Sequence, residues 1–193
     1  YVTCPTLRYH PAVVAQQSAT LQLLAEGRFT LGLGSGENLN EHVVGAGWPA
    51  IAERQDMLAE AIEVIRALPT GDLVKHRGGV FQVDSARIWD LPEQGVDIAL
   101  AVAGDRGIER FAPLADHLVA VEPDAGLVES WNSTGRAPRI GPAARGVGRI
   151  PICWDPARGG GGCRAPEAFR RVARGWEVNA GPPPPAGPPP AAQ

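Results

Sequence analysis

The sequence has few cysteines, scattered histidines and no long apolar run. Its three cysteines, Cys4, Cys153 and Cys163, are odd in number and show no CxxC or zinc-ligand spacing, which indicates a reducing compartment. The four histidines form no HExxH or similar pair, so we predict no metal site. Neither 18 consecutive apolar residues nor a signal-peptide pattern occurs, so the sequence predicts a cytoplasmic protein without a membrane partner.

The last third of the sequence lacks lysine and has few acidic residues. Residues 133–193 contain nine arginines against three acidic residues, together with 11 of the 24 glycines and 12 of the 19 prolines. Such a segment has little apolar periodicity with which to offset its ordering entropy. We therefore predict a folded domain over 1–132 and an irregular or disordered tail over 133–193. The few aromatic residues of the tail do not interleave with its arginines, so we expect no nucleic-acid partner.

Helix and strand patterns alternate along residues 1–132. The patterns predict helices over 10–27, 53–68, 106–115 and 125–131, strands near the amino terminus and over 29–33, 96–102 and 118–121, and a hairpin of 74–76 with 80–83. We expect residues 38–52 to form a loop. This alternation indicates an α/β protein with a parallel sheet. A (β/α)8 barrel is favoured because the strand ends carry Gly, Glu and Pro clusters, and a doubly wound sheet is the alternative.

Two of these helices carry side-chain patterns that predict their faces. In the first, Val13, Val14, Leu21 and Leu24 are expected to form one apolar face, and Gly27 to end the helix. In the helix over 53–68, the carboxylates are expected to form an exposed face: Glu53, Asp56, Glu60 and Glu63. Asp124 or an adjacent residue is expected to cap the last helix.

The segment RFTLGLGSGENLNE, residues 28–41, contains the most informative motif. A short strand runs into Gly32, Gly34 and Gly36, and the carboxylate of Glu37 follows at once. Glycines so spaced let a backbone approach a flat or phosphorylated ligand, although a tight turn with a solvated Glu37 remains the alternative. A dinucleotide-binding GxGxxG motif is disfavoured, because its sixth position is Glu37 and a carboxylate there would face a pyrophosphate.

Several motifs in order resemble the luciferase-like oxidoreductases that use the deazaflavin coenzyme F420, in the branch with F420-dependent glucose-6-phosphate dehydrogenases. The resemblance is carried by VTCPTLRYHPAVVAQQSATL, GRFTLGLGSGENLNEHVVG, WPAIAERQDMLAEAIEVIRAL, HRGGVFQV, VDIALAVAGDR and VAVEPDAGLVESW. It covers about residues 2 to 132. It implies a partial (β/α)8 barrel of the bacterial luciferase type. Because a whole barrel needs about 250 residues, we expect this chain to be a fragment of a longer protein.

The resemblance also implies roles for particular residues. Glu37 matches the acidic residue that exchanges a proton with the deazaflavin ring, a role suited to a positioned acid. Ala103 and Gly104 match a turn that holds the phosphate of the coenzyme, where Asp105 departs from the usual neutral residue. A βα loop with an Asp cap is the alternative for that turn. The remaining matched residues surround the ring and the tail of the coenzyme: Val2, Cys4, Ser35, Gly36 and Asn40.

Other members of the family transfer a hydride between a polar organic substrate and the coenzyme, and they commonly form homodimers. By this resemblance the substrate of the parent enzyme is a small molecule, with a sugar phosphate as one possibility. The residues that bind substrate in the family lie outside the matched stretch, so we expect this chain to be inactive alone. An FMN-dependent luciferase-like monooxygenase and a non-catalytic remnant that binds a homologue are the alternative hypotheses.

Overall fold

The computed structural model describes residues 2–3, 6–120, 124–134 and 146–148 of the chain. It divides into two units, the first formed by 1–35 with 49–150 and the second by 36–48 with 151–193. The predicted division into 1–132 and 133–193 remains a prediction, because most of the second segment lies outside the described residues. Within the described part, no helix is long and apolar enough to cross a membrane.

The first unit is built on a parallel sheet whose strands follow one another in chain order. These are β1 (Val2–Thr3), β2 (Thr30–Leu33), β5 (Asp97–Val102), β6 (His117–Ala120) and β7 (Gly146–Gly148). The sheet order is β1-β2-β5-β6-β7 and every pairing is parallel. A doubly wound sheet reverses its strand order at a switch point, whereas this sheet progresses in one direction, as in a barrel. The α/β prediction is confirmed, and β7 is a strand that the sequence did not predict.

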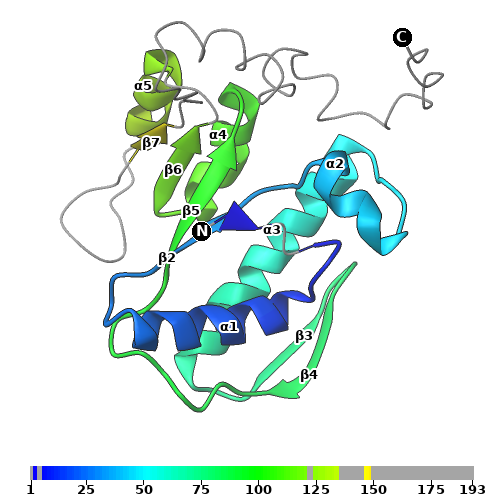
Figure 1. The fold of residues 1–193 in the computed structure, drawn as a ribbon, viewed down its shortest axis with the longest axis vertical. Helices are drawn as coiled ribbons and strands as arrows, with labels where there is room; N and C mark the ends of the chain where they lie inside the picture. The colour runs from blue at the N-terminus through cyan, green and yellow to red at the C-terminus, as the bar shows by residue number, and fades with distance from the viewer. Residues whose placement is uncertain (1, 4–5, 121–123, 135–145, 149–193) are drawn as a thin grey trace, which may run out of the picture. The chain divides into compact units, whose positions relative to one another are not determined.

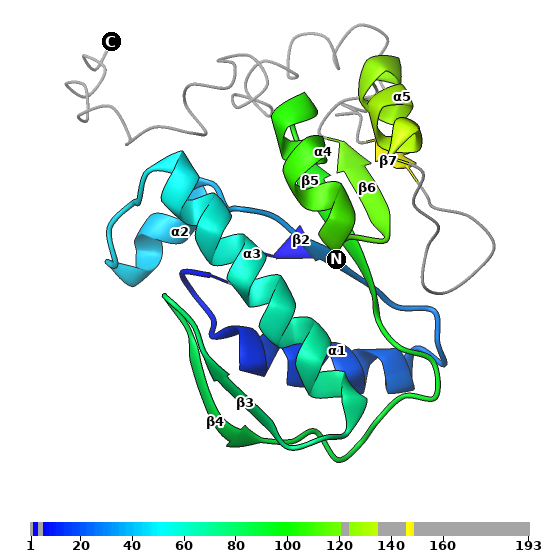
Figure 2. The same ribbon diagram turned by 180° about the vertical axis from the view of Figure 1, so that it is seen from behind.

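Four helices connect successive strands of the sheet (Figures 1 and 2). They are α1 (Pro11–Leu24), α3 (Ile51–Ala67), α4 (Asp105–Phe111) and α5 (Ala125–Ser133), close to the predicted ranges. The helix predicted over 106–115 ends earlier, and a 3-10 turn over 112–114 follows it. Asp124 accepts hydrogen bonds from the N–H groups of Gly126 and Leu127, which confirms its capping role.

The core lies between the sheet and helices α1, α3 and α4. The central strand β5 is buried along nearly its whole length, as expected of a parallel strand covered on both faces. Leu33, Leu100 and Leu118, from three neighbouring strands, each expose 1% or less of their surface. They belong to one cluster with Leu58 and Ile62 of α3. Burial of these side chains holds the sheet in the register that aligns its loops.

Buried polar groups join the amino-terminal ends of β5 and β6. Asp116 accepts hydrogen bonds from the Ile98 N–H (2.8 Å) and from Arg66 Nη2 of α3 (2.8 Å). His117 Nε2 lies 3.1 Å from Asp97 Oδ2, and both residues are buried. In parallel α/β proteins this end of the strands contributes to stability, and chemistry is carried at the opposite, carboxyl end.

The apolar face predicted for α1 is wrong in part. Val14 is buried, but Val13, Leu21 and Leu24 are exposed. The buried side is instead formed by Pro11, Val14, Ala15, Ser18, Ala19 and Gln22. The four predicted residues lie within one arc of about 100° around the helix, and only Val14 borders the buried side.

The exposed carboxylate face predicted for α3 is also wrong at one position. Glu60 is half-buried and points to the hairpin of β3 (Val74–Arg77) and β4 (Gln82–Ala86). Its carboxylate accepts hydrogen bonds from the N–H groups of Phe81 (2.7 Å) and Val80 (3.0 Å), and His76 Nε2 lies 3.1 Å away. A side chain at Gly78 would collide with Glu60 Oε1. Burial by itself raises the pKa of Glu60, but the hydrogen bonds from Phe81, His76 and Val80 outweigh it and the pKa is lowered.

Replacing Glu60 tests this attachment of the hairpin. Glu60→Gln removes a charged acceptor, and we expect it to lower the free energy of unfolding at pH 7 by about 2 kcal/mol. Because the folded-state pKa is lowered, the carboxylate stabilises the fold at neutral pH. That stabilisation disappears as the pH falls below about 4, through the lowered pKa. Urea denaturation at several pH values measures the difference, and Glu63→Gln, on the exposed side of the same helix, should change little at any pH.

Helix α1 ends in a Schellman motif that places Glu26 in a left-handed conformation. Glu26 N–H donates to the Leu23 carbonyl (3.1 Å) and Gly27 N–H donates to the Gln22 carbonyl (3.0 Å). Glu26 has φ +52° and Gly27 has φ +79°. Gly27 was predicted to end the helix, but glycine is most favoured at the position that Glu26 occupies.

Substitution by glycine should therefore have opposite effects at two glutamates. We expect Glu26→Gly to raise the free energy of unfolding by about 1 kcal/mol, because glycine adopts positive φ without strain. Glu63→Gly, inside α3, should lower it by about 1 kcal/mol through lost helix propensity. Thermal denaturation of both variants provides the measurement, and a loss of stability in Glu26→Gly would contradict the strain at that position.

Candidate functional site

The carboxyl edge of the sheet brings together several residues predicted to bind a ligand. Val2 of β1 pairs with Gly32 of β2, and Leu33 of β2 pairs with Leu100 of β5. Because these strands are parallel, the segments that follow them emerge at one edge. Ser35 follows β2, and Ala103 with Gly104 follows β5. The structure therefore places four predicted residues along this edge, whereas Cys4 lies outside the described residues.

The structure explains one of the three glycines of the motif. Gly36 has φ +84°, a left-handed conformation that glycine adopts most readily. Gly32 is buried, and a Cβ at Gly34 would lie 3.4 Å from Ala101 Cβ on the neighbouring strand β5, which is an ordinary contact distance. Turn geometry therefore explains Gly36 without any ligand, whereas packing does not require glycine at Gly34.

Gly104 has a different environment. Its φ of 178° is extended backbone that any residue adopts, and a Cβ built there meets no atom within 4 Å. It precedes α4 without a side-chain cap, so the alternative of an Asp cap at this turn is wrong, and Asp105 is the first helical residue. The first N–H groups of a helix have no partner within the helix. In α4 these N–H groups belong to Asp105 and Arg106, whose side chains are exposed, and the preceding Gly104 is surrounded by open space.

The second unit contains Glu37 and Asn40. Glu37 precedes α2 (Asn38–Glu41), and its backbone carbonyl accepts from the N–H groups of Asn40 (2.9 Å) and Glu41 (3.0 Å). Asn40 Nδ2 donates to Glu37 Oε2 (3.1 Å), so the two predicted residues contact each other. The loop predicted over 38–52 is wrong in its first part, which forms α2 and a 3-10 turn over 42–44.

Two buried polar residues of α2 were not predicted from the sequence. Asn38 exposes 4% and Glu41 exposes 2% of its surface. Buried polar side chains in native proteins are hydrogen-bonded, which makes both residues part of the local structure that carries Glu37. No local pattern of the sequence signals their burial, which depends on three-dimensional packing.

Comparison with known protein families identifies the family of this chain. The sequence model of the luciferase-like monooxygenase family matches residues 2–153. The chain belongs to this family. Among the described residues, no group of three or more His, Cys, Asp or Glu side chains could hold a metal ion.

Curated relatives of the chain are F420-dependent dehydrogenases. An F420-dependent glucose-6-phosphate dehydrogenase of Amycolatopsis mediterranei is 48% identical over 104 residues, which are 53% of this chain and 31% of the relative. An F420-dependent hydroxymycolic acid dehydrogenase of Mycobacterium tuberculosis is 39% identical over 123 residues, covering 64% of this chain and 34% of that protein. The chain thus spans about a third of the length of the curated relatives that it matches.

Solved structures confirm the fold of the family. An F420-dependent secondary alcohol dehydrogenase in complex with an F420-acetone adduct is 33% identical, with a TM-score of 0.65 over 69% of this chain and 42% of that one. The monooxygenase RslO1 from Streptomyces bottropensis is 19% identical, with a TM-score of 0.63 over 90% of this chain and 56% of that one. The second likeness concerns the fold alone.

Two glycines of the site should respond differently to alanine. We expect Gly36→Ala to lower the free energy of unfolding by about 1 kcal/mol, because it forces a Cβ into positive φ. Gly104→Ala should change it by less than about 0.5 kcal/mol, because its backbone is extended and its surroundings are open. Urea denaturation of both variants checks the pair, and equal losses would show that Gly104 is constrained by packing.

Proposed function

We propose that this chain carries part of the coenzyme F420 site of a hydride-transferring oxidoreductase. The observation that carries the proposal is the position of the glycine-rich motif. It follows β2, directly beside β5, at the carboxyl edge of a parallel sheet, in a chain 33–48% identical to proteins named as F420-dependent. In barrels of this kind, chemistry is carried at that edge. FMN as the cofactor has weaker support, because the structures whose names include FMN are only 16% and 18% identical.

The role proposed for Glu37 is that of a proton donor and acceptor. When bound, the deazaflavin supplies hydride chemistry at C5, and charge develops on its ring. A carboxyl group held beside the ring can exchange the proton that balances this charge. Asn40 Nδ2 donates to Glu37 Oε2, so we propose Asn40 as a positioning residue that orients the carboxylate. We propose Val2, Cys4, Ser35 and Gly36 as the backbone segments that line the ring.

The turn at Ala103 and Gly104 fits a phosphate in two respects. Gly104 has no side chain, and a Cβ there would project into open space. The first N–H groups of α4 are donors without an intrahelical acceptor. The negative charge of Asp105 disfavours binding of an anion in this turn. The positive charge of the next residue, Arg106, offsets that repulsion in our proposal. We propose that these backbone donors hold the phosphate of the coenzyme.

For the whole protein, we propose a small polar organic substrate, with a sugar phosphate as the specific candidate, and a homodimer in the cytoplasm. The relatives support the substrate class through their names, as a glucose-6-phosphate and an alcohol dehydrogenase. We propose that the chain by itself binds coenzyme but does not turn over substrate, because it spans about a third of its curated relatives.

Fluorescence titration of F420 with the purified chain tests the coenzyme site. We expect binding of F420 and no comparable binding of FMN. Gly104→Ala should weaken F420 binding at least tenfold, because its methyl group enters the space proposed for the phosphate. Gly107→Ala is the matched control in the same helix, where a Cβ meets only Val102 atoms at ordinary contact distance, and it should bind F420 within twofold of wild type.

Three results would contradict the proposal. Absence of F420 binding would contradict the proposed coenzyme site, and preferential FMN binding would favour the monooxygenase hypothesis. Reduction of F420 by glucose 6-phosphate at an ordinary enzymatic rate would contradict the proposed inactivity of the isolated chain.

A further inference from the structure

Helix α1 begins with a histidine cap whose geometry requires one protonation state. His10 has an extended backbone (φ −66°, ψ 136°) and precedes Pro11, the first helical residue. The Nδ1 atom of His10 accepts a hydrogen bond from the Ala12 N–H at 3.1 Å. Because a backbone N–H can only donate, Nδ1 has to present its lone pair and cannot carry a proton. The cap therefore requires a neutral imidazole.

The other donors of this first turn do not depend on the imidazole. Pro11 has no N–H, and the N–H groups of Val13 (2.9 Å) and Val14 (3.3 Å) both donate to the His10 carbonyl. Within this described turn, Ala12 N–H is the one donor that a side chain satisfies. If Nδ1 gains a proton, two N–H groups face each other across 3.1 Å and the ring has to rotate away. Ala12 N–H then loses its acceptor, which is equivalent to loss of the cap.

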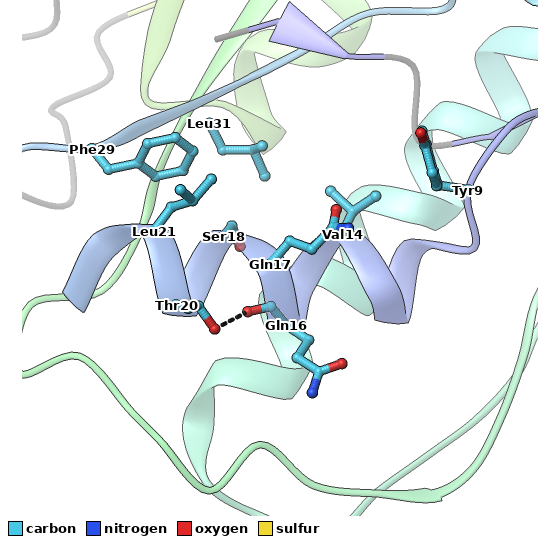
Figure 3. Close-up of a pocket in the computed structure, with 9 residues that line it drawn as sticks. All are labelled: Tyr9, Val14, Gln16, Gln17, Ser18, Thr20, Leu21, Phe29 and Leu31. Atoms are coloured by element: carbon cyan, nitrogen blue, oxygen red, sulfur yellow. Dashed lines mark hydrogen bonds between the residues drawn. The ribbon is translucent and has the colours of Figure 1, made fainter. Parts of the chain in front are cut away.

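Helix α1 contains no group that would attract the positive charge of a protonated His10. Its sequence, PAVVAQQSATLQLL, has no acidic residue. Its hydroxyl groups bond within the helix, as Thr20 Oγ1 does with the Gln16 carbonyl at 3.2 Å (Figure 3). The amino-terminal end of a helix also carries partial positive charge and disfavours a cation. The helix therefore favours the neutral form of its cap.

The ring of His10 also contacts the hairpin of β3 and β4. It meets the ring of Phe81 edge to face, with centroids 5.5 Å apart and an interplanar angle of 84°. Phe81 is buried and packs with Met57 and Ala61 of α3 and with Leu7. The tip of the hairpin thus lies beside the start of α1 (Figures 1 and 2). Rotation of the His10 ring breaks this contact together with the cap.

The segment before α1, the hairpin tip and the facing turn of α3 carry the following charged or titratable side chains: Arg8, Tyr9, Glu60, His76 and Arg77. The two arginines disfavour a further positive charge on His10. Glu60 would favour it, but the Glu60 carboxylate already accepts from two N–H groups of the hairpin tip and lies 3.1 Å from His76 Nε2. These surroundings therefore do not replace the acceptor that a protonated His10 withdraws from the helix.

We propose that His10 is a pH-sensitive switch at the start of α1. With a neutral imidazole, the cap and the contact with Phe81 are formed. When Nδ1 takes up a proton, the ring turns away, the first turn of α1 opens and the hairpin tip loses its contact with that turn. The folded chain then binds this proton less tightly than the unfolded chain, so stability falls as the pH falls through the range of about 8 to 5 in which imidazoles titrate. This inference does not depend on whether the chain binds F420.

Replacing His10 with a cap residue that does not titrate tests the switch. Asn is a good helix cap, so His10→Asn keeps the cap at every pH. Urea denaturation of the full chain at about pH 8 and about pH 5.5 gives the equilibrium constant of unfolding. Over this range we expect the constant to rise about fivefold more in wild type than in His10→Asn, which is the effect of one cap. If His10→Asn does not fold, His10→Ser takes its place, because Ser is also a good cap.

His42→Asn is the matched control. His42 is exposed like His10, and its Nδ1 also has a backbone partner, the Asn38 carbonyl at 3.0 Å. Because a carbonyl can only accept, Nδ1 of His42 donates, and protonation of the ring leaves this hydrogen bond intact. We therefore expect His42→Asn to show the same loss of stability at acid pH as wild type.

Hydrogen exchange of single amides separates opening of the cap from a general effect of pH. After correction for the intrinsic exchange rate, Ala12 N–H should lose its protection at acid pH in wild type and keep it in His10→Asn. Gly126 N–H, which donates to Asp124 Oδ1 at 2.8 Å, is the internal reference, because its acceptor is a carboxylate and not an imidazole.

Three results would overturn the inference. The first is an equal pH dependence of stability in wild type and in a folded cap variant. The second is protection of Ala12 N–H that persists at acid pH in wild type. The third is a gain in stability of wild type over His10→Asn at acid pH, which would show that Phe81 or Glu60 holds the protonated ring in place.

Discussion

Strands β2 and β5 are separated by more than sixty residues, yet they pair at four consecutive positions from Thr30 with Asp97 to Leu33 with Leu100. This pairing is the constraint on which the candidate site depends. It brings the glycine-rich segment after Leu33 and the Ala103–Gly104 turn to one edge of the sheet. The register is maintained by apolar burial, because a shift of one residue would turn Leu31 and Leu33 away from the helices that cover them.

The polar groups of the sheet are divided between its two ends. At the amino-terminal end, Asp116 joins the backbone of Ile98 to Arg66 of α3 through buried hydrogen bonds. Buried groups satisfied in this way cost stability when one partner is removed, so they are suited to holding strands in place. At the carboxyl end the Gly104 turn has an extended backbone with open space around it. The polar groups at the amino-terminal end of the strands thus stabilise the sheet, and the carboxyl end is available to bind a ligand.

The sequence was sufficient to predict elements that have a clear period or a clear cap. The alternation before Gly34, the helical spacing of α3 and the Asp124 cap all depend on neighbours within a few residues, and the structure confirms them. Glu60 was assigned wrongly because its partners, the N–H groups of Val80 and Phe81, are twenty residues away. The contact between Asn40 and Glu37 was missed because the segment after Glu37 was predicted as a loop, which hid their one-turn spacing. Burial of Asn38 and Glu41 depends on three-dimensional packing that no local pattern reports.

The error on α1 has a different cause. The four apolar residues of the predicted face lie within about 100° of one another around the helix, but only Val14, at one border of this arc, is buried. From Val14 the buried side continues away from the predicted face, through Ala15, Ala19 and two polar residues, Ser18 and Gln22. Gln22 is held there by distant partners, because its Nε2 donates to the Gly95 carbonyl and its Oε1 accepts from the Phe29 N–H. A buried side that includes a polar residue satisfied by a carbonyl more than seventy residues away cannot be located from apolar periodicity alone.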